Sequence, residues 1–154
     1  MIILNLFLIA FFVVCYAVGG QGHKWIRRFL GPGVFGAGLI LLSILKHHFG
    51  VLPVLAGAWY IPSLILFKYG VNDGPIWKKV FLRGVYGASL GVSGLLAGIA
   101  GHNVLLGVAQ LILATATSIL FGVLNPFSKL GDKGVILEDA CIAFGCVFLV
   151  PFIC

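Results

Sequence analysis

Charged side chains are scarce in this sequence. Asp, Glu, Lys and Arg make up 9% of the 154 residues, against about 25% in ordinary soluble domains. Only 4 of these residues are acidic, and the hydrophobic fraction is 61%, against a usual ~45 to 50%. This composition excludes a soluble enzyme with a charged surface and a disordered chain. It also leaves no polar domain to bind a nucleic acid.

Six long segments lack any Asp, Glu, Lys, Arg or His. Five of them reach the roughly 17 to 25 apolar residues that a transmembrane helix needs. The last reaches this length if Glu138 and Asp139 sit at the headgroup level, where a charge costs less than at mid-bilayer; an interfacial segment is its alternative. We predict an all-α polytopic membrane protein, a single membrane domain over 1–154, with about six spans at 2–19, 30–45, 51–67, 80–100, 103–124 and 135–153.

The first of these spans resembles a secretory signal in its apolar core. It lacks the basic n-region of such signals, so we expect it to be retained as a transmembrane helix.

Basic residues are distributed very unevenly over the predicted loops. Nine of the ten Lys and Arg residues fall on one side of the membrane, and only Lys46 falls on the other. Because basic loops stay in the cytoplasm, this bias places both termini outside. We predict a multi-pass protein of a plasma membrane, specifically the bacterial inner membrane.

The predicted inner face also carries Trp25 and Trp77 beside its basic pairs. Aromatic and basic side chains together suit a surface that holds anionic lipid headgroups. The predicted lipid contacts are Arg27, Arg28, Lys78, Lys79 and Arg83. For Arg83, which intrudes into a span, snorkelling to the headgroups is the simpler interpretation.

The sequence contains an internal similarity at an offset of 51 residues. Residues 33–39 match residues 84–90, and a basic pair precedes each copy. This match predicts a tandem, parallel repeat of two-span units over 23–73 and 74–126, with the first and last helices outside it. Coincidence in a chain rich in Gly, Ala and Leu is the alternative.

Glycines in the fourth span follow spacings of 3, 4, 3 and 4, which keep one narrow seam facing a partner. Such a seam allows close backbone approach in a membrane. The seam consists of Gly84, Gly87, Gly91, Gly94 and Gly98, with a weaker version at Gly33 and Gly36. It predicts either packing of spans two and four within the chain or a seam of a homo-oligomer.

Polar and aromatic side chains gather near the middle of spans three and five. A proline close to them frees a backbone carbonyl. Such groups line a permeation path or, alternatively, hold helices together through packing and hydrogen bonds. The candidate path residues are Trp59, Tyr60, Ser63, Gln110, Thr115 and Ser118.

The predicted outer face carries three histidines that are weak candidates for a metal site: His47, His48 and His102. Adjacent histidines point in different directions on a helix, and no acid on that face could orient a ring. We therefore predict interfacial histidines, no metal and no cofactor.

These features support three functions to different degrees. The first is a permeation protein, a small channel, pore or facilitator, acting as an oligomer. The second is a non-catalytic scaffold or accessory subunit bound to a membrane protein partner. The third is an intramembrane lipid-modifying enzyme, which is supported only by Arg83 and the outer histidines. We therefore predict that the protein is not an enzyme.

Overall fold

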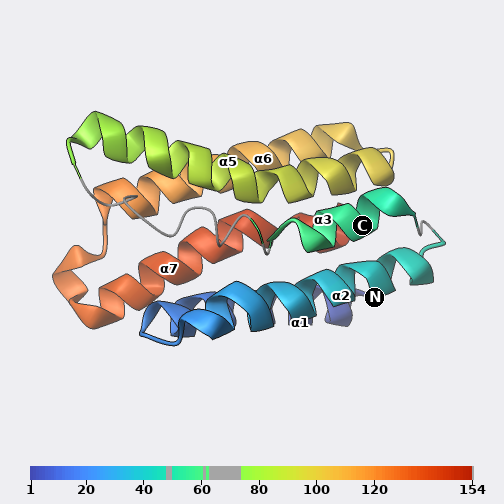
Figure 1. The fold of residues 1–154 in the computed structure, drawn as a ribbon, viewed down its shortest axis with the longest axis horizontal. Coiled ribbons are helices and arrows are strands. Elements are labelled where there is room, and N and C mark those ends of the chain that lie inside the picture. The colour runs from blue at the N-terminus through green and yellow to red at the C-terminus, as the bar shows by residue number, and fades with distance from the viewer. Residues whose placement is uncertain (48–49, 61, 63–73, 154) are drawn as a thin grey trace.

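The computed structural model describes residues 1–47, 50–60, 62 and 74–153, most of which are helical (Figure 1). Two of the elements, η1 and η2, are single π-helical turns, and η3 is a short 3-10 turn. In chain order the elements are α1 (Ile2–Gly20), η1 (Ile26–Leu30), α2 (Gly31–Leu45), α3 (Val51–Ala58), α5 (Ile76–Ala100), α6 (Val104–Ile119), η2 (Leu120–Leu124), η3 (Ser128–Leu130), α7 (Asp132–Val147) and α8 (Val150–Ile153).

Five described helical segments are long and apolar enough to cross a membrane, which fits the predicted polytopic membrane protein. They are Ile2–Gly20, Ile26–Leu45, Ile76–Ala100, Val104–Leu124 and Asp132–Ile153. The predicted third span, 51–67, is described only through α3, Trp59, Tyr60 and Pro62. Its remaining residues lie outside the described ranges, so the predicted number of six stays a prediction.

Several helices begin earlier than the predicted spans. The helix α5 begins at Ile76, after the extended Pro75, and so includes Lys78 and Lys79. The helix α7 begins at Asp132. The predicted spans began only after the basic residues, but the backbone hydrogen bonds of a helix can include charged residues at the membrane surface.

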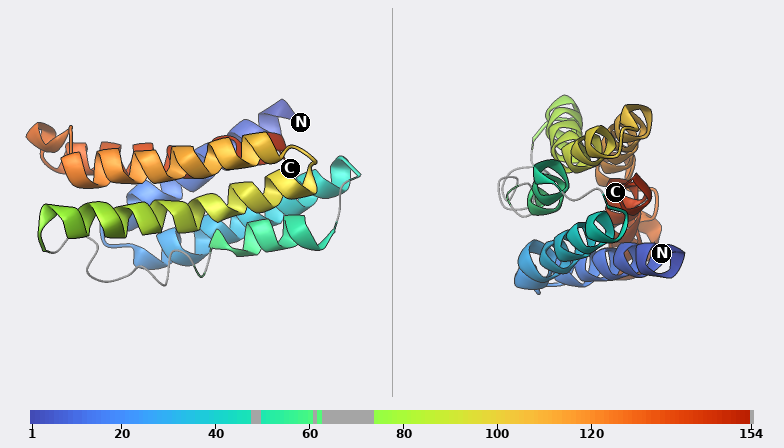
Figure 2. Two further views of the ribbon diagram at one scale, coloured as in Figure 1. Left: turned by 90° about the horizontal axis from the view of Figure 1, so that it is seen from above. Right: turned by 90° about the vertical axis from the view of Figure 1, so that its right-hand side faces the viewer.

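The helices are arranged as a ring in chain order. Each of α1, α2, α3, α5, α6 and α7 packs on the next, and α7 packs on α1 to close the ring. Viewed along the bundle, the pair α5 and α6 and the pair α1 and α2 lie on opposite sides, with α3 and α7 between them (Figure 2). Both termini lie at one end (Figure 1).

We call the opposite end the basic end, because it carries Arg27 on η1 and Lys79 and Arg83 on the first turns of α5. The concentration of basic residues at one end agrees with their predicted loops. Which side of a membrane this end faces remains a prediction.

The centre of the ring is filled with side chains. Phe12, Phe35 and Tyr60 are almost fully buried, and their ring centroids lie 5.2 to 5.3 Å apart. The Ser93 hydroxyl donates to the Ala56 carbonyl, and Trp59 Nε1 donates to the Ser89 carbonyl at 2.7 Å. These contacts fasten α3 and the residue that follows it to α5.

The glycine seam of α5 packs on α6 within the same chain. A Cβ atom placed on Gly91 would lie 2.8 Å from Cα of Leu111, and one on Gly98 would lie 2.8 Å from Cα of Gly107. Gly87 and Gly94 face α6 in the same way, and Gly84 lies in ordinary contact with Ile119. One alternative given for the seam was packing of the fourth span, α5, on the second span, α2. The structure instead places the seam against α6, the helix that follows α5.

The equivalent glycines of α2 behave differently from each other. Gly36 faces Gly57 of α3, where an added Cβ would lie 2.8 Å from the Gly57 carbonyl oxygen, and Gly33 has nothing within 4 Å. Each of the two predicted repeat units therefore contains a contact between glycine and the next helix. True duplication remains a prediction.

Candidate functional site

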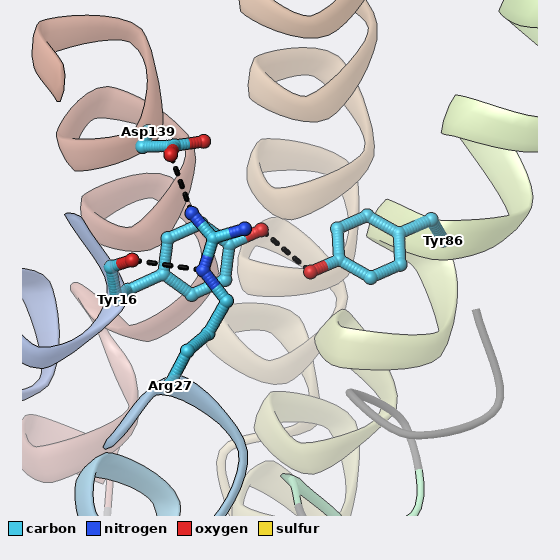
Figure 3. Close-up of polar contacts among 4 residues, drawn as sticks. All are labelled: Tyr16, Arg27, Tyr86 and Asp139. Atoms are coloured by element: carbon cyan, nitrogen blue, oxygen red, sulfur yellow. Dashed lines mark hydrogen bonds and ion pairs between the residues drawn. The ribbon is translucent and has the colours of Figure 1, made fainter. Parts of the chain in front are cut away.

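Four helical segments meet around the side chains of Arg27 and Tyr16 near the basic end (Figure 3). Nε of Arg27 donates to the backbone carbonyl of Tyr16 at 2.8 Å, and Nη2 forms an ion pair with the Asp139 carboxylate. The guanidinium carbon lies 4.0 Å from the centroid of the Tyr16 ring. The hydroxyl of Tyr16 is in turn hydrogen-bonded to that of Tyr86 at 2.5 Å. We call these four residues the Arg27 network; it joins α1, η1, α5 and α7.

The Arg27 network spans the boundary between the core and an opening at the basic end. Tyr16 and Tyr86 are 2% and 7% exposed, whereas the side chains of Arg27 and Asp139 are 25% and 18% exposed. The two charges therefore compensate each other where little water reaches them, and removing one would leave the other uncompensated.

Two consecutive glycines at the end of α1 make room for Arg27. A Cβ on Gly19 would lie 2.8 Å from the backbone nitrogen of Arg27, and one on Gly20 would overlap the ion pair with Asp139. Arg27 itself stands on the π-helical turn η1. Such turns are rare and are frequent at functional sites.

A cavity of about 730 Å³ opens beside the Arg27 network. Its charged lining comes from three cationic and three acidic side chains, and its apolar lining comes mainly from Phe121, Val123, Val135 and Ile142. The charged residues are Arg27, Lys79, Arg83, Asp132, Glu138 and Asp139. The volume falls within the ~300 to 1,000 Å³ of small-ligand sites.

Glu138 is the most buried of these carboxylates, with 7% of its surface exposed. Its Oε1 accepts the backbone N–H of Phe127 at 3.0 Å. With the Asn125 amide in the orientation that satisfies its hydrogen bonds, its nitrogen donates to Glu138 Oε2 at 3.3 Å and to the Phe121 carbonyl at 3.0 Å. Glu138 therefore fastens the loop after η2 to α7.

The side chain of Arg83 packs on Gly122 in the second π-helical turn, η2, and both residues line the cavity. A Cβ on Gly122 would lie 2.6 Å from Nε of Arg83, so a larger residue at this position would displace the Arg83 side chain. Asn125 follows η2 with φ +45°, in the left-handed region that Asn tolerates better than most residues. Two π-helical turns thus flank one cavity.

The predicted lipid-contact residues separate into two groups. Arg27, Lys79 and Arg83 line the cavity. Arg28 is half-buried on η1 and Lys78 is exposed on α5, and neither belongs to the described cavity lining. The structure therefore gathers three of the five predicted residues around one cavity.

The candidate path residues lie in contacts between or within helices. Gln110 is buried and binds Gly145 and Leu149. Among the others, Tyr60 donates to the Cys146 carbonyl at 3.3 Å, Ser118 to the Arg83 carbonyl at 2.8 Å and Thr115 to the Leu111 carbonyl at 2.8 Å, while Trp59 binds Ser89. Ser63 lies outside the described residues.

Two of the three predicted outer histidines, His47 and His102, lie at the end opposite the cavity. His47 and His102 each follow the last residue of a helix by two positions and have φ values of +58° and +54°. His48 lies outside the described residues. Among the residues that the structure places, no group of three or more His, Cys, Asp or Glu side chains is arranged to hold a metal ion.

Sequence reasoning missed the partners of Arg27. Tyr16 was not singled out, Tyr86 appeared only within the repeat match, and Asp139 was placed at the headgroup level without a partner. An acid in the last span and an arginine before the second could have been paired, because charges within a membrane protein tend to pair with one another.

The fold and the cavity together define a helical, polytopic membrane protein with a charged cavity at one end of its bundle. No family model, curated protein or solved structure matches this chain. The function therefore has to be argued from the cavity itself.

Proposed function

We propose that this protein is a non-catalytic lipid-binding component of a membrane, which takes the phosphate-bearing headgroup of an amphipathic lipid into the cavity at the basic end. The single observation that carries the proposal is the convergence of three cationic side chains on one cavity from two different parts of the chain: Arg27, Lys79 and Arg83. Arginine and lysine side chains are the usual ligands of phosphate groups.

The acidic side chains of the cavity are compatible with an anionic ligand. Asp139 is engaged by Arg27, and Glu138 accepts the N–H of Phe127. Two of the three carboxylates are thus held by donors of the protein itself. These fixed roles also favour binding over acid–base catalysis.

The depth of the charges points to an amphipathic ligand. Arg83 and Asp139 each lie seven residues from the first residue of their helix. At about 1.5 Å per residue they lie about 10 Å along the helix from its first residue. A headgroup that reaches these residues brings its acyl chains to the level of the bilayer, where the apolar lining from Phe121 and Ile142 is available.

Binding of a short-chain lipid tests the proposal directly. We expect the detergent-purified protein to bind dioctanoyl phosphatidic acid, measured by titration calorimetry, and not dioctanoylglycerol, which lacks the phosphate. Lys79→Gln and Arg83→Gln should each weaken binding about tenfold, because a hydrogen bond to a charged group is worth about 1.5 to 3 kcal/mol. Lys129→Gln, at an exposed residue outside the described cavity lining, is the matched control.

Inorganic phosphate separates two sources of the same chemistry. Tighter binding of phosphatidic acid than of phosphate supports a lipid ligand, whereas equal binding indicates a site for a soluble phosphate compound. If phosphatidic acid and dioctanoylglycerol bind alike, or if Lys129→Gln weakens binding as much as Lys79→Gln, the proposal is wrong.

Permeation has less support from the geometry. The candidate path residues Gln110 and Ser118 are buried and hydrogen-bonded to neighbouring helices, so a path through this ring would require those contacts to open. Permeation, oligomer formation and a membrane protein partner all remain predictions. Solute flux into liposomes that contain the protein, at a rate above that of empty liposomes, would favour a channel over the binding role.

A further inference from the structure

The Arg27 network contains two tyrosines that do not line the described cavity, and their geometry bears on how Arg27 is presented to a ligand. We infer that Tyr86 is a positioning residue for the proposed headgroup site, acting through Tyr16 on the guanidinium of Arg27. This inference rests on the proposed function, because it concerns the same cavity.

Tyr16 holds Arg27 in two ways at once. Its backbone carbonyl accepts from Nε at 2.8 Å, and its ring lies 4.0 Å below the guanidinium carbon. A guanidinium stacked on an aromatic face is held in one plane. Nε donates to Tyr16 and Nη2 is paired with Asp139, so the donors that Arg27 can offer to a ligand are those of Nη1 and the second N–H of Nη2.

Tyr86 fixes the ring on which Arg27 stacks. The two hydroxyls are 2.5 Å apart, both tyrosines are buried, and they come from α5 and α1 (Figure 3). Tyr86 is absent from the described cavity lining, so it touches a ligand only through this chain of contacts. Loss of its hydroxyl would leave the Tyr16 hydroxyl without this partner and free its ring to change orientation.

A positioned arginine binds more tightly than a mobile one, since less side-chain freedom is lost on binding. Tyr86→Phe should therefore lower the affinity for dioctanoyl phosphatidic acid by about threefold to tenfold, the range that one buried hydrogen bond supports. Tyr60→Phe is the matched control, because it also removes a buried hydroxyl, one that donates to Cys146 rather than to the Arg27 network.

A double-mutant cycle distinguishes positioning from a general loss of stability. Arg27→Lys keeps the positive charge but loses the planar fork that stacks on Tyr16. If Tyr86 acts through Arg27, then Tyr86→Phe should change the affinity by less than about twofold in the Arg27→Lys background. An equal loss in both backgrounds, or no loss in either, overturns the inference.

A second measurement does not depend on the ligand. The Nε–H of Arg27 should give a slowly exchanging ¹⁵N resonance in wild type and in Tyr60→Phe, and it should exchange faster in Tyr86→Phe. Failure of wild type to bind lipid, together with this change in exchange, would reject the proposed function and keep the positioning role. An unchanged Arg27 resonance in Tyr86→Phe would reject the positioning role itself.

Discussion

The side-chain amide of Gln110 bridges Gly145 of α7 and Leu149, which lies just beyond the end of α7. In a continuous helix the N–H of Leu149 would donate to the carbonyl of Gly145, four residues earlier. Instead, Leu149 donates to Gln110 Oε1 at 2.8 Å, and Gln110 Nε2 donates to the Gly145 carbonyl at 2.7 Å. The amide is inserted into the break between α7 and α8, two residues before Pro151.

Replacing Gln110 should therefore be costly. Gln110→Leu leaves the buried Gly145 carbonyl and the partly buried Leu149 N–H without this partner, and each unsatisfied buried group costs about 1 to 3 kcal/mol. We expect the free energy of unfolding to fall by about 2 to 4 kcal/mol, measured by unfolding in mixed micelles. Thr115→Val removes a hydroxyl whose hydrogen bond among the described residues goes to Leu111 of its own helix, and it should change the free energy of unfolding by less than about 0.5 kcal/mol.

The glycine seam gives a second test, because the same substitution can be made at a closely packed glycine, Gly91, and at an open one, Gly33. Gly91→Leu forces a side chain against Leu111, whereas Gly33 has open space around it. Overpacking costs about 1 to 3 kcal/mol, so Gly91→Leu should lower the melting temperature and Gly33→Leu should not. Light scattering should give both variants the wild-type mass, since the seam is occupied within the chain. A Gly91→Leu protein of normal stability and smaller mass would instead make the seam an oligomer interface.

The ion pair of Arg27 and Asp139 should show strong coupling. Arg27→Met or Asp139→Leu alone leaves one partly buried charge without its partner, which costs about 3 kcal/mol or more. The double variant removes both charges and should be more stable than either single variant, measured by the same unfolding assay. If the two single effects simply add, the pair contributes little and the charges are solvated separately.

The orientation predicted from the basic residues can be checked with reporter fusions. Alkaline phosphatase is active only outside the cytoplasm, so a C-terminal fusion expressed in a bacterium should be active. Green fluorescent protein, which folds in the cytoplasm, should remain dark at the same position. The reverse result would place the basic end outside and contradict the positive-inside prediction.

The sequence predicted those features of the fold that depend on local spacing. Apolar length indicated the spans, and the spacing of Gly87, Gly91, Gly94 and Gly98 marked the face of α5 that packs on a neighbour. The spacing of glycines shows which face of a helix is closely packed, but it does not show which helix packs there. The seam therefore suited α2, another molecule or α6 equally well until the structure placed α6 there.

The candidate site depends on contacts that no local pattern encodes. Arg27 and Asp139 are separated by 112 residues, and the hydroxyls of Tyr16 and Tyr86 meet only because α1 and α5 face each other across the ring. Basic residues at one end were predictable from loop charge. The cavity between them was not, because η1, η2, α7 and the first half of α5 form it together.

The closed ring of helices also sets an order for biogenesis. A ribosome delivers α1 and Arg27 to the membrane first, and α7, which carries Asp139 and packs on α1, is the last of the ring helices to follow. Until that last helix enters, Arg27 lacks its carboxylate and the cavity lacks one wall. The assembled site therefore exists only in the finished molecule, and a chain stalled before α7 would display an unpaired arginine at the membrane surface, the kind of signal by which unfinished membrane proteins can be distinguished from finished ones.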